Sequence, residues 1–230
     1  MSTIYDRTEL LIGLEALEKL KKAKVLIVGL GGVGGYLAEA LARAGIGTLG
    51  LCDFDVVDVT NINRQIYALS TTIGGLKTDI ARERIGNINS AIKINVYPFK
   101  LDEITINRIN LEEYDYVVDA IDDVAAKVLL IKAARLKEIR VISAMGAGNK
   151  VDPFKYKIAD IEKTNTCPLA RSMRKELKSQ GIRDVCVLFS QEPVIKTGQA
   201  GVKPVTASIS YMPAIGGLMM ACKVIRDLIE

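Results

Sequence analysis

The glycine-rich segment at residues 29–35 constrains the fold of this chain more than any other feature. It contains Gly29, Gly31, Gly32 and Gly34, and it stands between a short apolar run and an alanine- and leucine-rich segment. Glycines between a strand and a helix allow a tight turn and let the backbone approach a phosphate, which the N–H groups at the helix start can bind. The segment therefore predicts a nucleotide-binding loop, although a tight turn without a ligand would give the same pattern.

Strands and helices are expected to alternate through the first part of the chain. Apolar runs indicate buried strands at Lys24–Val28, Thr48–Cys52, 92–98, 114–120 and Arg140–Ala144. Helical patterns indicate helices at 8–22, 35–44, 77–87, 104–109 (a short one) and 124–137. In the first of these helices the shared apolar face would be formed by Leu10, Leu14, Leu17 and Leu20 or Leu11. Such alternation predicts an α/β fold with a Rossmann-like, doubly wound and mainly parallel sheet.

Beyond residue 145 the alternation loosens. The sequence predicts a glycine loop at 146–150, strands at Tyr156–Asp160 and 185–189, a basic helix at Pro168–Ser179, a mobile crossover loop at 191–204 and a closing apolar helix at 213–229. The length of 230 residues suits one compact α/β domain, so we expect this region to form a small C-terminal extension of it.

The composition excludes several kinds of chemistry. The chain has no histidine, which excludes Ser-His-Asp triads, Cys-His pairs and histidine-bound metals, and it has no C-x-x-C pair for a zinc site. No apolar run reaches the roughly 20 residues that cross a bilayer, and the start of the chain lacks a signal-peptide pattern. We therefore expect a cytoplasmic protein without a membrane partner. The net charge of +4 is too small by itself to indicate nucleic-acid binding.

The four cysteines are widely separated, and a cytoplasmic protein is expected to keep them reduced. Cys52 and Cys186 lie in predicted strands and Cys222 in the closing apolar helix, so we expect all three in the core. Cys167 precedes a proline in a polar loop and is the one candidate for an exposed, reactive thiol.

Asp53 ends the second predicted strand, where an acidic residue binds a ribose hydroxyl in dinucleotide-binding folds. These features fit an NAD-dependent dehydrogenase as well as an ATP-binding protein. Two cations then follow, Arg64 in the next loop and Lys77 at the start of the next helix. A triphosphate needs such cations because charge builds on its phosphates as a bond breaks, whereas the glycine loop already serves a diphosphate. The pattern favours ATP, although two solvated surface cations would look the same.

Two acidic residues follow a later strand, at the sheet edge where doubly wound folds bind ligands. Asp122 has the hard carboxylate oxygens that Mg²⁺ prefers, so it could hold the ion against ATP. Alternatively, Asp122 or Asp123 is the N-cap of the helix that starts near Val124. The order of residues leaves both interpretations open.

Together these motifs resemble the ThiF/MoeB/HesA family, bacterial relatives of the ubiquitin-activating enzymes. The motifs that carry the resemblance are Tyr5-Asp-Arg7, residues 29–35, Asp53-x-Asp55, Asn61-x-Asn63-Arg64-Gln65, Gly74-x-x-Lys77 and Asp119-Ala-Ile-Asp122. The resemblance implies one ThiF-type adenylating domain over residues 1–230. Residues 1–148 would form its ATP-binding core, and residues 149–230 would face the substrate and include the closing helix.

The resemblance also implies ATP and Mg²⁺ as cofactors and a role for each motif residue. Asp53 would hold the ribose, and Asp122 would bind Mg²⁺. The phosphates would be bound by Asn61, Arg64, Gln65 and Lys77, with Asp55 and Asn63 as further members of the nucleotide site. In this family an arginine like Arg7 reaches into the ATP site of the partner subunit, so a catalytic Arg7 would require a homodimer. Arg64, Lys77 and Asp122 would complete the catalytic set.

Two later stretches, 159–178 and 184–192, resemble the branch of this family formed by the tRNA threonylcarbamoyladenosine dehydratases (TcdA, also called CsdL). The resemblance implies that ATP activates a carboxylate at its α-phosphate and that the acyl-adenylate is trapped by a neighbouring carbamoyl group. An intramolecular nucleophile has a high effective molarity, so this reaction needs no histidine or thiolate of the enzyme. The alternative is an activator of a ubiquitin-like sulfur-carrier protein, with Cys167 as a possible acceptor. An NAD-dependent oxidoreductase is a remote third interpretation.

The predicted basic helix has a charge pattern that suits a tRNA partner. Between Lys163 and Arg183 there are six lysines and arginines and one acidic residue, Glu176. Such a helix beside the active crevice would follow tRNA phosphates, with the candidate contacts Arg171, Arg174, Lys175 and Lys178. A solvated helix face would carry a similar pattern.

Overall fold

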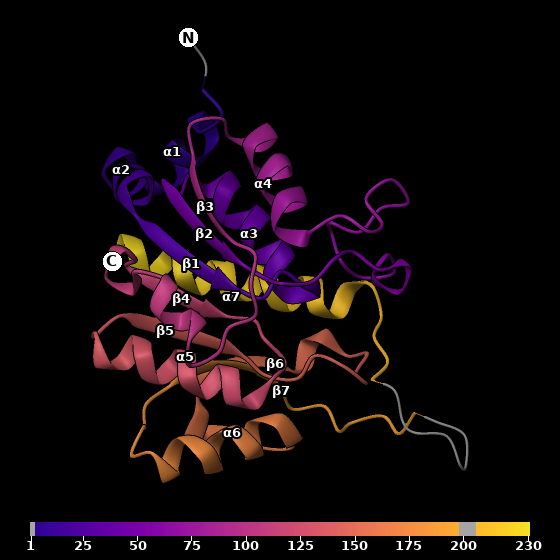
Figure 1. Ribbon diagram of the computed structural model, residues 1–230. Coiled ribbons are helices and arrows are strands. Elements are labelled where there is room, and N and C mark those ends of the chain that lie inside the picture. Colours follow the sequence, from indigo (N-terminus) through magenta and orange to yellow (C-terminus); the bar gives the residue numbers. More distant parts are fainter. Residues whose placement is uncertain (1–2, 198–205) are drawn as a thin grey trace.

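The computed structural model describes residues 3–197 and 206–230, and these residues form a seven-stranded sheet in the order β3-β2-β1-β4-β5-β7-β6 (Figure 1). The strands are β1 (Lys24–Val28), β2 (Thr48–Cys52), β3 (Lys93–Tyr97), β4 (Tyr116–Asp119), β5 (Arg140–Ala144), β6 (Tyr156–Asp160) and β7 (Cys186–Ser190). All neighbouring pairs are parallel except β6 and β7. The predicted α/β class with a mainly parallel sheet is confirmed, and the C-terminal region extends this same sheet.

Helices cover both faces of the sheet. They are α1 (Asp6–Ile12), α2 (Leu14–Lys22), α3 (Gly32–Ala44), α4 (Lys77–Ile88), α5 (Val124–Leu136), α6 (Pro168–Ser179) and α7 (Tyr211–Ile229). Val25 and Ile27 of β1 pack with apolar residues of α3, α4 and α7, whereas Leu26 and Val28 pack with those of α5 and α6. Successive side chains of a strand point to opposite faces, so each buried strand contributes to two apolar cores.

The strand order reverses direction at β1, which has β2 on one side and β4 on the other. The chain first builds outward from β1 to β2 and β3, and then crosses to β4 and β5. In open α/β sheets such a reversal opens a crevice beyond the carboxyl ends of the strands, and ligands bind there. A ligand is therefore expected to bind beside the segments that follow β1, β2 and β4.

The predicted helix at 8–22 is wrong as a single element. Gly13 has φ +83°, a left-handed conformation that ends α1 and separates it from α2. As a result Leu10 and Leu11 are 88% and 85% exposed, and only Leu17 and Leu20 of the expected apolar face are buried. A helical hydrophobic period does not show that a glycine within it bends the chain away from the core.

Other differences concern the ends of elements. The short helix expected at 104–109 is a 3₁₀ turn at Thr105–Arg108, the strand expected at 114–120 is shorter, and α3 begins three residues before its expected start. The loop expected at 191–204 lies partly outside the described residues, and within it Ile195 N donates to Asn149 O at 2.9 Å.

The environments of two cysteines differ from the prediction. Cys167 is only 3% exposed, because it immediately precedes α6 and packs with the apolar residues beneath that helix. Cys222 is exposed, because Ala221 and Val224 form the inward side of α7. Cys52 is buried as expected, and burial raises the pKa of its thiol to about 12; Cys186 is half-buried. No helix within residues 3–197 and 206–230 is long and apolar enough to cross a membrane.

Candidate functional site

A cavity of about 640 Å³ opens beyond the carboxyl ends of β1, β2 and β4. The structure brings ten of the residues predicted to bind the nucleotide to its walls: Gly29, Gly31, Gly32, Asp53, Asp55, Asn61, Arg64, Gln65, Lys77 and Asp122. Gly34 and Asn63 do not line it. Gly34 is buried at the start of α3, and the Asn63 amide donates to Ser208 O at 3.1 Å.

The glycine loop fits tightly against its own backbone. Gly29 has φ +94°, and a Cβ there would lie 2.6 Å from Ala120 O. A Cβ on Gly34 would lie 1.8 Å from Gly29 O, whereas one on Gly31 would meet nothing closer than the Gln65 amide at 3.9 Å. Helix α3 begins at Gly32, and no side chain of residues 3–197 or 206–230 caps its first N–H groups. These N–H groups are suited to bind a phosphate at the cavity wall.

Asp53 is fixed by backbone N–H groups on both sides of its carboxylate. Its Oδ2 accepts from Leu30 N at 2.6 Å and its Oδ1 from Asp55 N at 2.8 Å. Burial raises the pKa of the Asp53 carboxyl above its usual range, although these hydrogen bonds and the nearby Lys77 ammonium oppose the rise. Each carboxylate oxygen can accept more than one hydrogen bond, so this rigid group can also accept from ribose hydroxyls.

Arg64 and Lys77 both reach the cavity, but their surroundings differ. Lys77 has a side chain only 6% exposed, and its Nζ forms an ion pair with Asp55 Oδ2 at 2.7 Å. The Arg64 guanidinium donates to Thr60 O at 2.8 Å and to Asn63 Oδ1 at 2.9 Å. A buried lysine is not a solvated surface cation, so that alternative is excluded for Lys77. The two cations lie on the wall of one cavity, as binding of a triphosphate requires.

The buried amide of Gln65 also suits a ligand. Gln65 lines the cavity and is 7% exposed, and its Oε1 has no hydrogen-bond partner among the described residues. Buried acceptors are rarely left without a partner in folded proteins. An N–H or O–H donor of a bound molecule would satisfy this oxygen.

The two neighbouring aspartates after β4 have different surroundings. Asp123 Oδ1 accepts from Ala126 N at 2.9 Å, so Asp123 is the N-cap of α5. Asp122 lines the cavity with an exposed side chain that has no partner among the described residues. The described residues hold no group of three or more acidic or cysteine side chains that could bind a metal. One free carboxylate fits Mg²⁺ in the way typical of nucleotide sites, where phosphate oxygens and water supply the other ligands.

Arg7 does not line the cavity of its own chain. It is exposed on α1, which lies beside α2 at the end of the sheet where the strands begin (Figure 1). The cavity lies at the opposite end of the strands. Within one chain, the structure therefore does not bring Arg7 together with the other predicted catalytic residues.

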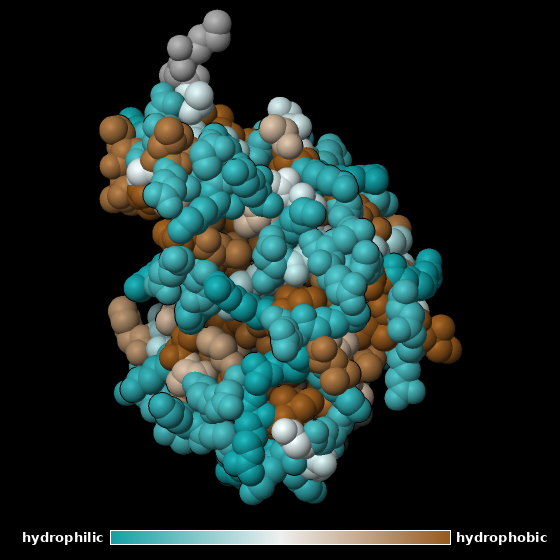
Figure 2. All heavy atoms as spheres, turned by 90° about the vertical axis from the view of Figure 1, so that its left-hand side faces the viewer, coloured by the Kyte–Doolittle hydropathy of each residue, from teal (hydrophilic) through white to brown (hydrophobic). Residues whose placement is uncertain are grey.

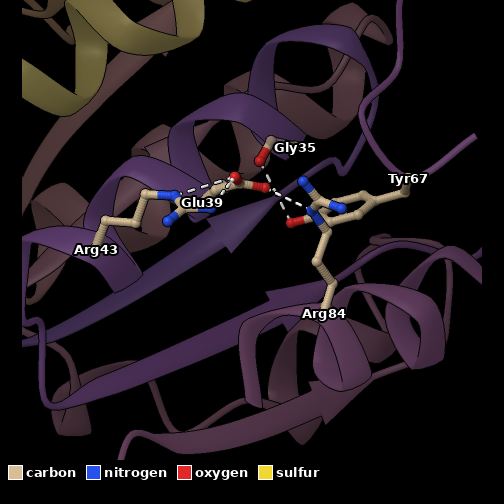
Figure 3. A network of polar contacts seen from close by, with 5 residues as sticks. All are labelled: Gly35, Glu39, Arg43, Tyr67 and Arg84. Atoms are coloured by element: carbon tan, nitrogen blue, oxygen red, sulfur yellow. Dashed lines mark hydrogen bonds and ion pairs between the residues drawn. The ribbon is translucent and has the colours of Figure 1, made fainter. Parts of the chain in front are cut away.

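A buried acidic residue that the motifs did not indicate joins the two helices behind this site (Figure 3). Glu39 of α3 accepts from Arg43 at 2.8 Å and from Arg84 of α4 at 2.5 Å, and Tyr67 donates to Gly35 O at 3.3 Å. Burial opposes ionisation, but the hydrogen bonds from Arg84 and Arg43 prevail and lower the pKa of the Glu39 carboxyl. In the sequence, the one signal for Glu39 was that it is the single acidic residue within the apolar pattern of residues 35–44.

The predicted basic helix exists as α6, and its cations are not equivalent. Arg171, Lys175 and Lys178 are exposed. Arg174 is half-buried and donates to Thr164 O at 2.8 Å and to the Thr164 hydroxyl, so it fastens the preceding turn to the helix.

The fold and the cavity define a Rossmann-like α/β protein with a nucleotide site at the reversal of its strand order. Residues 5–230 match the ThiF family, and the chain belongs to that family.

Several relatives are similar over most of the chain. The tRNA threonylcarbamoyladenosine dehydratase of Bacillus subtilis is 39% identical, over 98% of this chain and 94% of the relative. The enzyme of the same name from Escherichia coli is 41% identical over 83% of this chain and 74% of the relative. The crystal structure of the E. coli dehydratase TcdA in complex with ATP has a TM-score of 0.90 and 34% identity, and covers 97% of this chain and 93% of that chain.

More distant relatives match only part of the chain. The adenylyltransferase and sulfurtransferase UBA4 of Vanderwaltozyma polyspora is 41% identical over 60% of this chain, which is 31% of the relative. The resemblance noted from the sequence motifs, to the ThiF family and within it to the dehydratases, is thereby confirmed.

Proposed function

We propose that this chain is an ATP-dependent tRNA threonylcarbamoyladenosine dehydratase, which cyclises the modified adenosine through an acyl-adenylate. The observation that carries the proposal is the single cavity wall that joins the glycine loop to Arg64, Lys77 and Asp122. Relatives named as these dehydratases match nearly the whole length of the chain, and one of them binds ATP in its crystal structure. The relatives that are sulfurtransferases share only part of the chain, so they support the carrier-protein alternative less.

In the proposed reaction a threonyl carboxylate oxygen attacks the α-phosphorus of ATP, the bond to the bridging oxygen breaks, and pyrophosphate leaves. The neighbouring carbamoyl group then attacks the activated carbonyl, and AMP leaves with the carboxylate oxygen. The balance is the loss of one water from the nucleoside: its oxygen leaves on AMP, and its two protons are released to the products and the solvent. The nucleophile belongs to the substrate, so the enzyme's task is to bind, orient and neutralise.

The residues of the cavity divide this task. The N–H groups at the start of α3, together with Arg64 and Lys77, would neutralise the charge that develops on the phosphates. To do so Lys77 exchanges its contact with Asp55 for a phosphate oxygen. Asp53 would accept from the ribose hydroxyls. Asp122 would hold Mg²⁺, which when bound neutralises further phosphate charge.

We further propose that the active form is a homodimer. Arg7 lies at the far end of the sheet from its own cavity, so it can act only on the cavity of another copy. The surface around it is apolar: Ile4, Leu10, Leu11 and Leu14 are between 57% and 88% exposed. Figure 2 shows hydrophobic surface beside the N-terminal end of the molecule. Exposed apolar surface of this kind is typical of an interface.

The tRNA substrate would be held in part by α6, through the exposed Arg171, Lys175 and Lys178. Arg174 remains a candidate contact only through the part of its side chain that the Thr164 turn leaves free. A tRNA substrate also agrees with the expected cytoplasmic location.

Exchange of labelled pyrophosphate into ATP tests the proposed adenylation. We expect exchange to depend on threonylcarbamoylated tRNA and to be absent with the same tRNA lacking the threonylcarbamoyl group. Stimulation by a ubiquitin-like carrier protein ending in Gly-Gly, without stimulation by the tRNA, would overturn the proposal in favour of a carrier-protein activator. Cys167 is buried, so it offers such a carrier no exposed thiol in this structure.

A further inference from the structure

A lysine and an aspartate form an ion pair inside the protein, directly behind the segment that carries Asp122. The side chains of Lys127 and Asp119 are both 0% exposed, and Lys127 Nζ lies 3.0 Å from Asp119 Oδ2. Ser143 Oγ donates to the same carboxylate oxygen at 2.5 Å. Removing two charges from water is so unfavourable that apolar residues of the same volume often stabilise a core as well as a buried ion pair does. Stability alone therefore explains this pair poorly.

Both charges bind the backbone of one residue. Lys127 Nζ donates to Ile121 O at 2.8 Å, and Asp119 Oδ1 accepts from Ile121 N at 3.1 Å. The Ile121 carbonyl belongs to the peptide bond that leads into Asp122. On the other side of Asp122, the side chain of Asp123 is fixed to the start of α5. Asp122 is thus exposed to the cavity but held between two fixed points of the backbone.

The remaining contact of the lysine fixes this segment to the next strand. Lys127 Nζ donates to Ala144 O, at the end of β5, at 2.7 Å. Together with the ion pair to Asp119, these two hydrogen bonds place three protein oxygens around the ammonium. The same segment lies close against the glycine loop, since a Cβ on Gly29 would lie only 2.6 Å from Ala120 O.

We propose that Lys127 and Asp119 are positioning residues that hold the Asp122 carboxylate where the metal ion of Mg²⁺–ATP lies. They touch neither nucleotide nor metal and act through the Ile121 peptide. The inference rests on the proposed role of Asp122. It gives a role to Asp119, the first residue of the Asp119-Ala-Ile-Asp122 motif, and adds Lys127, which belongs to none of the motifs. Groups that orient a metal ligand typically change metal affinity by about 10- to 100-fold when they are removed.

The test measures ATP binding by titration calorimetry, without tRNA, in the presence of Mg²⁺ and in EDTA. Lys127→Met alone would leave the Asp119 charge unpaired in the core, which can unfold the protein. The variant is therefore Lys127→Met with Asp119→Asn, which removes both charges. We expect its Mg²⁺-dependent gain in ATP affinity to fall by about tenfold or more. Its affinity for AMP in EDTA and its cooperative thermal unfolding should be retained.

A matched control makes the same two substitutions in an ion pair of α7 that packs against the other end of β4. Lys223 and Asp227 form an ion pair on α7, and Asp227 accepts from Tyr116 Oη at 2.8 Å, far from the cavity. Lys223→Met with Asp227→Asn removes a partly buried pair in the same way. We expect this control variant to keep the wild-type gain in ATP affinity that Mg²⁺ causes, whatever its melting temperature. An equal loss in this control would overturn the positioning role.

A double-mutant cycle with Asp122→Asn shows whether the pair acts through Asp122. In that background, removal of the pair should change the affinity for ATP in Mg²⁺ by less than about twofold, since the group it positions is gone. A loss of the same size in both backgrounds, or no loss in either, would overturn the inference. Because no tRNA is used, a protein that binds Mg²⁺–ATP as expected but does not dehydrate tRNA would refute the proposed function and leave this inference standing.

Discussion

The proposed role of Asp53 at the ribose would link nucleotide binding to pH, because the carboxyl that accepts from Leu30 N and Asp55 N is buried. Its pKa is raised chiefly by burial, so on acidification it takes up a proton at a higher pH than an ordinary aspartate does. A protonated carboxyl has fewer acceptor positions for the ribose. Binding is therefore strongest above this pKa and weakens as pH falls through it.

The matching measurement is the affinity for adenosine, which has no titrating phosphate, as a function of pH. We expect the wild type to lose affinity in the acid range and Asp53→Asn to bind weakly, by about tenfold, with little dependence on pH; removal of a charge-assisted hydrogen bond has about that effect. A wild-type profile as flat as that of the variant would contradict the role of Asp53 at the ribose.

Residues of the site were easier to locate from the sequence than their roles were to distinguish. Asp122 and Asp123 are adjacent, and the sequence left open which of them is the N-cap of α5 until the fold showed which carboxylate accepts from Ala126 N. The environments predicted for Cys167 and Cys222 are wrong because burial depends on tertiary packing: α6 covers the loop that carries Cys167, and Cys222 lies on the side of α7 that faces away from the core. Lys127 looks in the sequence like one more lysine of a helix, and only its ion pair with Asp119 and its hydrogen bonds to Ile121 O and Ala144 O show its place.

At the scale of elements, the turn from β1 into α3 depends on glycines that have different reasons to be there. Gly34 is closed in by the Gly29 carbonyl, whereas Gly31 faces the cavity. We expect Gly34→Ala to destabilise the protein by about 3 kcal/mol, or roughly 10 °C in melting temperature, because the methyl group has no space. Gly31→Ala is the matched control and should melt within about 2 °C of wild type. Equal melting temperatures would show that the loop is less tightly packed than described.

The basic helix α6 is predicted to bind tRNA through its exposed side only. Lys175→Glu with Lys178→Glu should weaken tRNA binding and reduce its salt slope by about one for each phosphate that the helix no longer binds, without changing ATP affinity. Lys22→Glu with Lys93→Glu, two exposed lysines on α2 and β3, carries the same charge change elsewhere. Binding curves that do not differ between the two variants would remove α6 from the tRNA site.

Elements were predictable where burial dictates the pattern. The strands are short continuous apolar runs because helices cover both faces, and such runs are recognisable without tertiary information. The helix at 8–22 was not predictable as two pieces, because its apolar period continues through Gly13 and nothing local shows that α1 leaves the core. The exposed leucines of α1 are explained by the proposed homodimer, in which a second molecule would cover them.

For the whole molecule, the distance between Arg7 and its own cavity predicts complementation between two inactive variants. Arg7→Ala and Lys77→Ala should each lose pyrophosphate exchange, the second because it removes the buried cation proposed to bind the phosphates. Mixed and reassembled, they should regain about a quarter of wild-type activity, because half of the random dimers carry one intact site. An arginine that acts within its own chain would give no recovery, and size-exclusion chromatography of each variant serves as the control for assembly.

The activity proposed for the whole molecule is the removal of water from threonylcarbamoyladenosine in tRNA at the expense of ATP. It is measured by incubating the protein with ATP, Mg²⁺ and threonylcarbamoylated tRNA, and then determining the mass of the modified nucleoside after digestion. We predict the loss of one water from the nucleoside, with AMP and pyrophosphate formed in equal amounts, and no change with Lys77→Ala or without ATP. An unchanged nucleoside mass, with wild-type protein that binds both ATP and the tRNA, would contradict the proposed function.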